Sequence, residues 1–211
     1  MKDWRLIYII FAKSEDKLYI SNKNRQAYFV LLSVCIIFVR INLKNCNVMF
    51  DKETYVQRRA LLKKNIGSGV LLFLGNDEQG LNYEDNAFRY RQDSTFLYYF
   101  GLSFAGLSAI IDIDEDKEII FGDELTIDHI VWMGTQPTLK EKSERVGIRE
   151  TLPSVAIISY LHKAVQKGQT VHYLPPYRPE HKLKLMDWLG IPPARQEGSV
   201  PFIRAVVAQR N

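Results

Sequence analysis

Apolar residues in this chain gather into short blocks that alternate between the patterns of strands and helices. The run 70–74 (VLLFL) is entirely apolar and stops at Gly75, which is typical of a strand covered on both faces of a sheet. Before it, apolar residues recur near helical spacing after a possible cap at Asp51 and up to Gly67. These residues are Tyr55, Val56, Ala60, Leu61 and Leu62.

The remaining blocks predict one folded domain. Residues 107–113 and 118–121 flank an acidic turn, 114–117, which is typical of a hairpin. A further strand is expected over 170–174, and helices are expected over 138–146, 153–168 and 180–189. Strands interleaved with helices, together with one hairpin, predict a single α/β domain with a mixed β-sheet flanked by helices.

The first 48 residues do not follow this pattern. Residues 28–39 (YFVLLSVCIIFV) are apolar throughout but shorter than the roughly 20 residues that a membrane-spanning helix needs. They also follow too long a mixed segment to be a secretory signal. Three interpretations stay open: a buried element, a weak membrane anchor, or residues translated upstream of a true start at Met49. We favour the last, and expect the domain over 49–211 and no stable membrane attachment.

Charge and cysteine content separate the same two parts. The net charge is +4, but residues 1–48 hold eight Lys and Arg against three Asp and Glu, and the rest hold twenty against twenty-one. Composition therefore gives no support for nucleic-acid binding by the domain. Cys35 and Cys46, both in the leading segment, make neither a disulfide framework nor a C-x-x-C pair. This usage indicates a reducing compartment, and we expect the cytoplasm.

Residues 88–102 (FRYRQDSTFLYYFGL) are the most distinctive stretch. They combine two arginines, an aspartate and six aromatic rings, and Gly101 permits a turn with positive φ. We expect Arg91 and Asp93 to hold the fold as an ion pair or a network. Breaking one member of such a buried set typically costs about 3–5 kcal/mol.

This stretch resembles the RQDS/RQNS-F-Y-Y-G signature of the aminopeptidase P amino-terminal domain, which is the creatinase/prolidase-type domain of the Xaa-Pro aminopeptidases. Weaker similarities follow in order: 129–134 (HIVWMG) resembles an I-W-x-G segment, 171–177 (VHYLPPY) a late strand and loop, and 202–210 the start of a linker to a catalytic domain. The resemblance covers about 49–211. It implies the creatinase/prolidase amino-terminal fold, with ribonuclease H-like topology.

The resemblance also implies where the chemistry lies. In this family of metallopeptidases, two divalent ions, often manganese, are held by two Asp, one His and two Glu of a carboxy-terminal domain, which would begin beyond Asn211. We therefore expect no catalytic residue, no metal ligand and no cofactor in this chain. Its histidines have no H-E-x-x-H or other ligand spacing, and Ser94 has no adjacent base. The histidines are His129, His162, His172 and His181.

Two residues are implied as substrate contacts. In the family, the amino-terminal domain of one subunit lies near the active site of a neighbour, where a loop aspartate and an aromatic residue shape the pocket. Asp85 matches the aspartate, and its carboxylate could hold the free amino terminus of a peptide. Trp132 matches the aromatic residue, and its indole could wall off a proline ring. The alternatives are a loop cap for Asp85 and core packing for Trp132.

The function expected from the resemblance is that of the amino-terminal, non-catalytic domain of an Xaa-Pro aminopeptidase. Such a domain would support assembly into a dimer or tetramer, govern access of proline-containing peptides, and be inactive alone. The alternative is a stand-alone binding module, because catalytically dead relatives of this fold bind peptides or basic protein tails.

Overall fold

The computed structural model describes residues 49–83, 86–124, 126, 131, 134 and 136–210. The chain divides into two compact units, and all of these residues belong to the second, Asn47–Asn211. The three interpretations of residues 1–48 therefore lie outside the described residues. Within the described ranges, no helix combines the length and apolar character needed to cross a bilayer.

The sheet has five strands in the order β4-β3-β2-β1-β5. It pairs β1 antiparallel with β2 and β2 antiparallel with β3, whereas the outer pairs β1·β5 and β3·β4 are parallel. Four strands therefore run in one direction and β2 runs in the other, which confirms the predicted mixed sheet and its hairpin. The strands are β1 (Val70–Leu74), β2 (Ser108–Asp112), β3 (Lys117–Phe121), β4 (Glu150–Leu152) and β5 (Val171–Tyr173).

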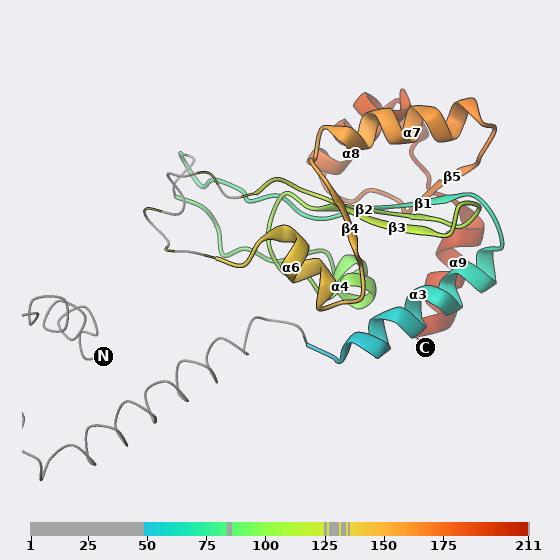
Figure 1. Ribbon diagram of the computed structural model, residues 1–211. Helices are drawn as coiled ribbons and strands as arrows, with labels where there is room; N and C mark the ends of the chain where they lie inside the picture. Colours follow the sequence, from blue (N-terminus) through green and yellow to red (C-terminus); the bar gives the residue numbers. More distant parts are fainter. Residues whose placement is uncertain are drawn as a thin grey trace, which may run out of the picture. The chain divides into compact units, whose positions relative to one another are not determined.

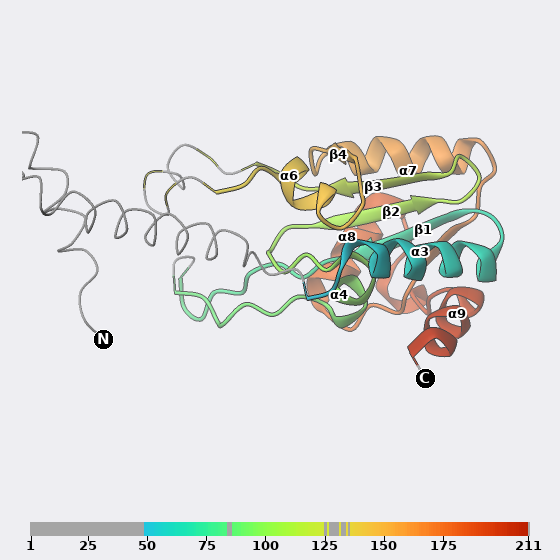
Figure 2. The same cartoon turned by 60° about the horizontal axis from the view of Figure 1, so that its bottom comes forward.

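Helices cover both faces of this sheet (Figures 1 and 2). One face is covered by α3 (Lys52–Ile66), α4 (Ser94–Phe100), α6 (Leu139–Glu144) and α9 (Val200–Arg210), and the other by α7 (Ala156–Gln166) and α8 (Pro179–Leu189). Alternate residues of β1 enter the two cores: Leu71 and Phe73 pack with the first group, and Val70 and Leu72 with the second. Burial on both faces explains why this strand is apolar throughout.

Four described elements were not predicted from the sequence: α4, β4, the 3-10 helix η1 (Pro193–Arg195) and α9. Residues 202–210, which resemble the start of a linker, form most of α9. Phe202, Ala205 and Val206 of this helix are buried in the core. Their spacing of three and four residues is that of a helix with one apolar face. Asp112, the last residue of β2 before the acidic turn, is buried and accepts hydrogen bonds from Tyr160 and Gln169.

Arg59 is the central polar anchor of the core. Its side chain is fully buried, and its Nε donates to Glu118 at 2.7 Å. The two terminal nitrogens donate to the carbonyl oxygens of Tyr99 and Val146, each at 2.9 Å. Burial lowers the pKa of this guanidinium, and the charge of Glu118 opposes that shift. One side chain thus joins α3 to β3, α4 and the segment after α6.

Candidate functional site

The candidate functional surface is the edge of the sheet at which β1, β3, β4 and β5 end. Because these strands run in one direction, their carboxyl ends lie at the same edge. The segments that leave it are 75–83, 122–124, 153–155 and 174–178. Ligands of open α/β sheets bind outside the carboxyl ends of the strands. We call this surface the carboxyl edge.

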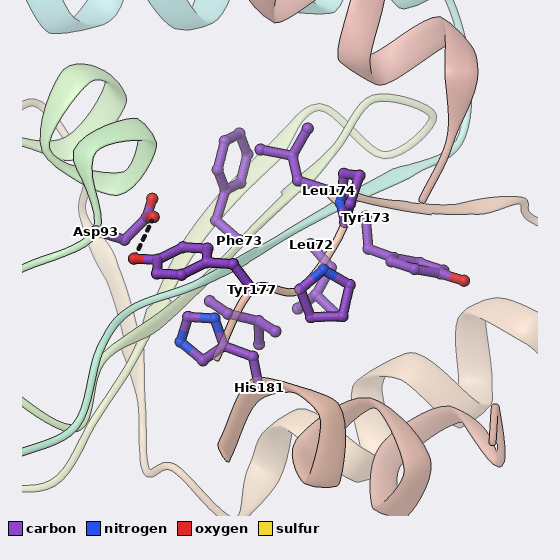
Figure 3. Close-up of a pocket in the computed structure, with 10 residues that line it drawn as sticks. Leu72, Phe73, Asp93, Tyr173, Leu174, Tyr177 and His181 are labelled. Carbon is purple, nitrogen blue, oxygen red and sulfur yellow. Dashed lines mark hydrogen bonds between the residues drawn. The ribbon is translucent and has the colours of Figure 1, made fainter. Parts of the chain in front are cut away.

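Asp93 links the distinctive stretch to this edge. One carboxylate oxygen accepts hydrogen bonds from the backbone nitrogens of Thr95 (2.8 Å) and Phe96 (2.9 Å), so Asp93 caps the start of α4. The other oxygen accepts from the hydroxyl of Tyr177 at 3.2 Å. Figure 3 shows this contact from α4 to the segment after β5, with His181 of α8 below it.

Arg91 joins the same network through its backbone and not through its charge. Its side chain is exposed, and no ion pair joins it to any described carboxylate. Its carbonyl oxygen accepts from the side-chain amide of Asn76 at 2.8 Å, and that amide lies 3.4 Å from the Tyr177 hydroxyl. The Arg91 backbone and the Asp93 carboxylate are thus linked through Asn76 and Tyr177, and the Arg91 guanidinium takes no part in this link. The ion-pair form of the Arg91–Asp93 hypothesis is wrong, because the Asp93 carboxylate is occupied by backbone N–H groups and Tyr177.

Gln92 holds this network together. It is 2% exposed, and its side-chain oxygen accepts from the backbone nitrogens of Asn76 (2.7 Å) and Asp93 (2.9 Å). Its side-chain nitrogen donates to the carbonyl oxygen of Phe104 at 2.9 Å. The hydroxyl of Tyr90 donates to the same carbonyl, and burial raises the pKa of this phenol. Sequence reasoning assigned no role to Gln92, although it lies inside the motif.

His181 fastens α8 to the end of β1. Its ring is buried, and Nε2 lies 3.0 Å from the carbonyl oxygen of Gly75. Because a carbonyl can only accept, Nε2 carries the proton. Burial lowers the pKa of His181, and it also lowers the pKa of His172 in β5. His162 is exposed on α7, and His129 lies outside the described residues.

Two hollows lie at the carboxyl edge. The hollow of Figure 3, bounded by Asp93, Tyr177 and His181, has a volume of about 40 Å³, which is room for little more than water. A cleft of about 340 Å³ lies beside Asp123 and Trp188. That volume falls in the lower range of small-ligand sites.

The larger cleft carries charge on its walls. Asp77 pairs with Lys184 at 2.7 Å, whereas Asp123 accepts from the backbone and hydroxyl of Ser154 at 3.0 and 2.5 Å. Among the described residues Asp123 forms no ion pair, although Lys184 lines the same cleft. A carboxylate without an ion pair can accept hydrogen bonds from an amino group. Among the described residues, no group of three or more His, Cys, Asp or Glu is placed to hold a metal ion.

Both predicted substrate contacts, Asp85 and Trp132, lie outside the described residues. Their roles stay predictions. The described segments that precede them, 75–83 and 122–124, begin where β1 and β3 end. Both therefore start from the carboxyl edge (Figure 1).

A mixed sheet with helices on both faces and the RQDS stretch at its carboxyl edge define the class of this domain. Residues 55–173 match the family "Aminopeptidase P, N-terminal domain". The chain belongs to this family.

Individual relatives agree with this placement. A probable Xaa-Pro aminopeptidase of Chaetomium globosum is 30% identical over 112 residues, which is 51% of this chain and 18% of that protein. The Xaa-Pro dipeptidase of Homo sapiens is 33% identical over 90 residues, 41% of this chain and 18% of that protein. The chain thus spans less than a fifth of the length of these relatives.

Solved structures share the fold. The aminopeptidase PepP of Pseudomonas aeruginosa superposes with a TM-score of 0.58 at 21% identity, covering 72% of this chain and 35% of that one. A variant of Escherichia coli aminopeptidase P superposes with a TM-score of 0.57 at 18% identity, covering 67% of this chain and 33% of that one.

Proposed function

We propose that this chain supplies the amino-terminal, non-catalytic domain of an Xaa-Pro peptidase, whose substrates are peptides with proline in second position. The observation that carries this proposal is the family match over 55–173, together with relatives that are Xaa-Pro aminopeptidases and Xaa-Pro dipeptidases. Metal-assisted hydrolysis then belongs to a separate catalytic domain, which would bind two divalent ions, most simply manganese. The proposal includes assembly as a homo-oligomer and a cytoplasmic location.

In this proposal the domain acts on substrate through the carboxyl edge. Asp85 would pair with the free amino group of the peptide, and Trp132 would contact the proline ring. The cleft lined by Asp123 and Trp188 supports the assignment, because a carboxylate that makes no described ion pair and an aromatic ring line one cleft at the same edge. The network of Gln92, Asp93 and Tyr177 would hold the edge rigid and take no part in the reaction.

The first experiment tests whether the chain is catalytic. The purified chain is incubated with an Xaa-Pro peptide and added manganese, and release of the first residue is followed by chromatography. Escherichia coli aminopeptidase P under the same conditions is the positive control. We expect no release by this chain, and metal-dependent release that increases with its concentration would contradict the proposal.

The alternative function, a stand-alone binding module, predicts tight and metal-independent binding. Isothermal titration with an Xaa-Pro peptide and with an unrelated basic peptide separates the two. Our proposal predicts weak but saturable binding of the Xaa-Pro peptide, at millimolar concentration, and no binding of the basic peptide. Saturable binding of the basic peptide at micromolar concentration would favour the module.

A further inference from the structure

A second cleft lies away from the carboxyl edge, where α3, α4 and α9 meet. It has a volume of about 540 Å³ and shares no lining residue with the two hollows at that edge. Its walls are mainly apolar and aromatic, but two arginines, Arg58 and Arg210, also line it. We call it the arginine cleft. The helix α3 lies beside both α4 and α9 (Figures 1 and 2).

Arg58 is held in place by aromatic rings. Its guanidinium carbon lies 4.0 Å from the ring centre of Tyr98 and 4.5 Å from that of Phe50. One terminal nitrogen donates to the carbonyl oxygen of Tyr98 at 2.9 Å. Stacking fixes the plane of the guanidinium, and one N–H bond fixes its rotation, so the group is ordered before any ligand arrives.

Arg210 approaches the same ring from α9. Its guanidinium carbon lies 5.7 Å from the ring centre of Tyr98, and one nitrogen lies 3.3 Å from the hydroxyl of Thr95. Tyr98 thus stands beside both cations, and its own hydroxyl donates to the carbonyl oxygen of Gln209. The two positive charges are therefore tied to one aromatic side chain.

Neither arginine is neutralised by a described residue. All ion pairs of the described part of the chain involve other cations. The hydrogen bonds that these two arginines make go to a carbonyl and a hydroxyl, which carry no charge. A guanidinium has five N–H donors in a planar fork that matches a carboxylate. The cleft thus presents ordered, unneutralised donors.

Apolar surface adjoins these donors. Phe50 is 46% exposed, and Leu97 of α4 also lines the cleft. An inorganic anion would leave this surface in water, whereas a carboxylate carried next to a large apolar side chain would cover it. The walls therefore favour a ligand that has both a carboxylate and a large apolar side chain.

We propose that the arginine cleft binds an acidic peptide segment in which a carboxylate stands beside an aromatic or large apolar side chain. The carboxylate accepts from Arg58 and Arg210, and the neighbouring side chain packs on Phe50 and Leu97. This site is separate from the substrate-facing carboxyl edge. This binding proposal does not depend on the proposed peptidase function, and either one can be wrong without the other.

The test is a titration of the isotopically labelled full chain with short capped peptides, followed by NMR. The probe is N-acetyl-Gly-Glu-Phe-Gly amide, and two matched peptides replace Glu by Gln or Phe by Gly. A further pair, N-acetyl-Gly-Gly-Phe with a free or an amidated end, separates a side-chain carboxylate from a terminal one. We expect saturable shifts at Leu97, Tyr98 and Ser103 with the Glu-Phe peptide, and about tenfold weaker binding of each matched peptide.

Variants locate the binding on the two arginines. Arg210→Gln and Arg58→Gln should each weaken the Glu-Phe peptide about tenfold, because each removes a charge-assisted hydrogen bond. Arg204→Gln is the matched control, since Arg204 is exposed on α9 and does not line the cleft. Its binding should equal that of the unchanged chain. Thermal unfolding checks each variant, and Arg210→Gln carries the test if Arg58→Gln unfolds.

Three binding results would overturn the proposal. They are no saturable shift at millimolar peptide, equal binding of the Glu and Gln peptides, and equal loss of binding in Arg204→Gln. A concentration-dependent dimer that Arg210→Gln abolishes would also overturn it, because a second copy of the chain would then be the occupant.

Discussion

The hydroxyl of Tyr177 lies 3.2 Å from the Asp93 carboxylate, although the two residues are 84 positions apart in sequence. Asp93 starts α4 on one face of the sheet, and Tyr177 precedes α8 on the other. The hydrogen bond therefore joins, at the carboxyl edge, the helices on one face of the sheet to those on the other. It also places the most distinctive motif of the chain at the edge that we propose faces substrate.

Asp93→Ala should destabilise the fold by about 1 kcal/mol, and at most about 2, because the first turn of α4 loses its cap. Asp93→Asn should cost less, since an amide oxygen still accepts from Thr95 and Phe96. Denaturant unfolding of both variants measures the difference. Equal free energies of unfolding for Asp93→Ala and the unchanged chain would show that the cap contributes nothing.

Gln92→Leu should reduce the free energy of unfolding by more than Asp93→Ala does. It leaves two buried N–H groups without their acceptor, and each unsatisfied group costs about 1–3 kcal/mol. Gln92→Glu is the matched variant, because it keeps the acceptor, and its carboxyl group replaces the donor to Phe104. We expect Gln92→Leu to have the lower unfolding midpoint of the two. The reverse order would contradict the role given to the acceptor.

Arg59→Met should reduce the free energy of unfolding by about 3–5 kcal/mol, because it leaves two buried carbonyl groups without their donor and Glu118 with Lys63 as its remaining partner. Lys64→Met on the exposed side of α3 is the control, and its effect should stay within about 0.5 kcal/mol. Urea unfolding measures both. A small effect at Arg59 would mean that the buried guanidinium is not the anchor of this core.

His181 should make stability depend on pH. Its folded pKa is lowered first by burial and further by Lys184, whereas the Gly75 carbonyl, Asp93 and Glu180 oppose the shift. The unfolded chain, with a histidine pKa of about 6.5, therefore binds more protons than the folded chain as pH falls below that value. The stability that the neutral His181 side chain contributes is fully present above about pH 6.5, and it is lost as the pH falls through the pKa of the folded state.

The measurement is the free energy of unfolding across this pH range for three chains. His181→Gln should flatten the decrease at low pH, because its side-chain amide can still donate to Gly75 but does not titrate. His162→Gln, a change on the exposed face of α7, should leave the slope unchanged. An identical slope in all three chains would assign the pH dependence elsewhere.

The elements that could be predicted from the sequence are those marked by a pattern of neighbouring residues. The run of β1 is apolar because both of its faces are buried, and the hairpin of β2 and β3 is marked by its acidic turn. β4 is only three residues long, which is too short for a periodic signal. In α9 the apolar spacing was present and could have identified the helix.

The contacts of the carboxyl edge could not be predicted in the same way. Gln92 bonds to Asn76 and Phe104, and Tyr177 bonds to Asp93, so each role depends on chain segments that only the fold brings together. The adjacent pair Arg58 and Arg59 shows the same limit. One is stacked in a cleft and the other is fully buried, and nothing in the sequence distinguishes them.

Contact between Trp132 and an Xaa-Pro peptide would show most directly that this domain takes part in substrate binding. The chain has three tryptophans, so fluorotryptophan labelling gives three fluorine resonances, and Trp132→Phe identifies one of them. We predict that an Xaa-Pro peptide shifts this resonance and that the same peptide with alanine in place of proline shifts it less. An unchanged Trp132 resonance at saturating peptide, or equal shifts with both peptides, would contradict the account.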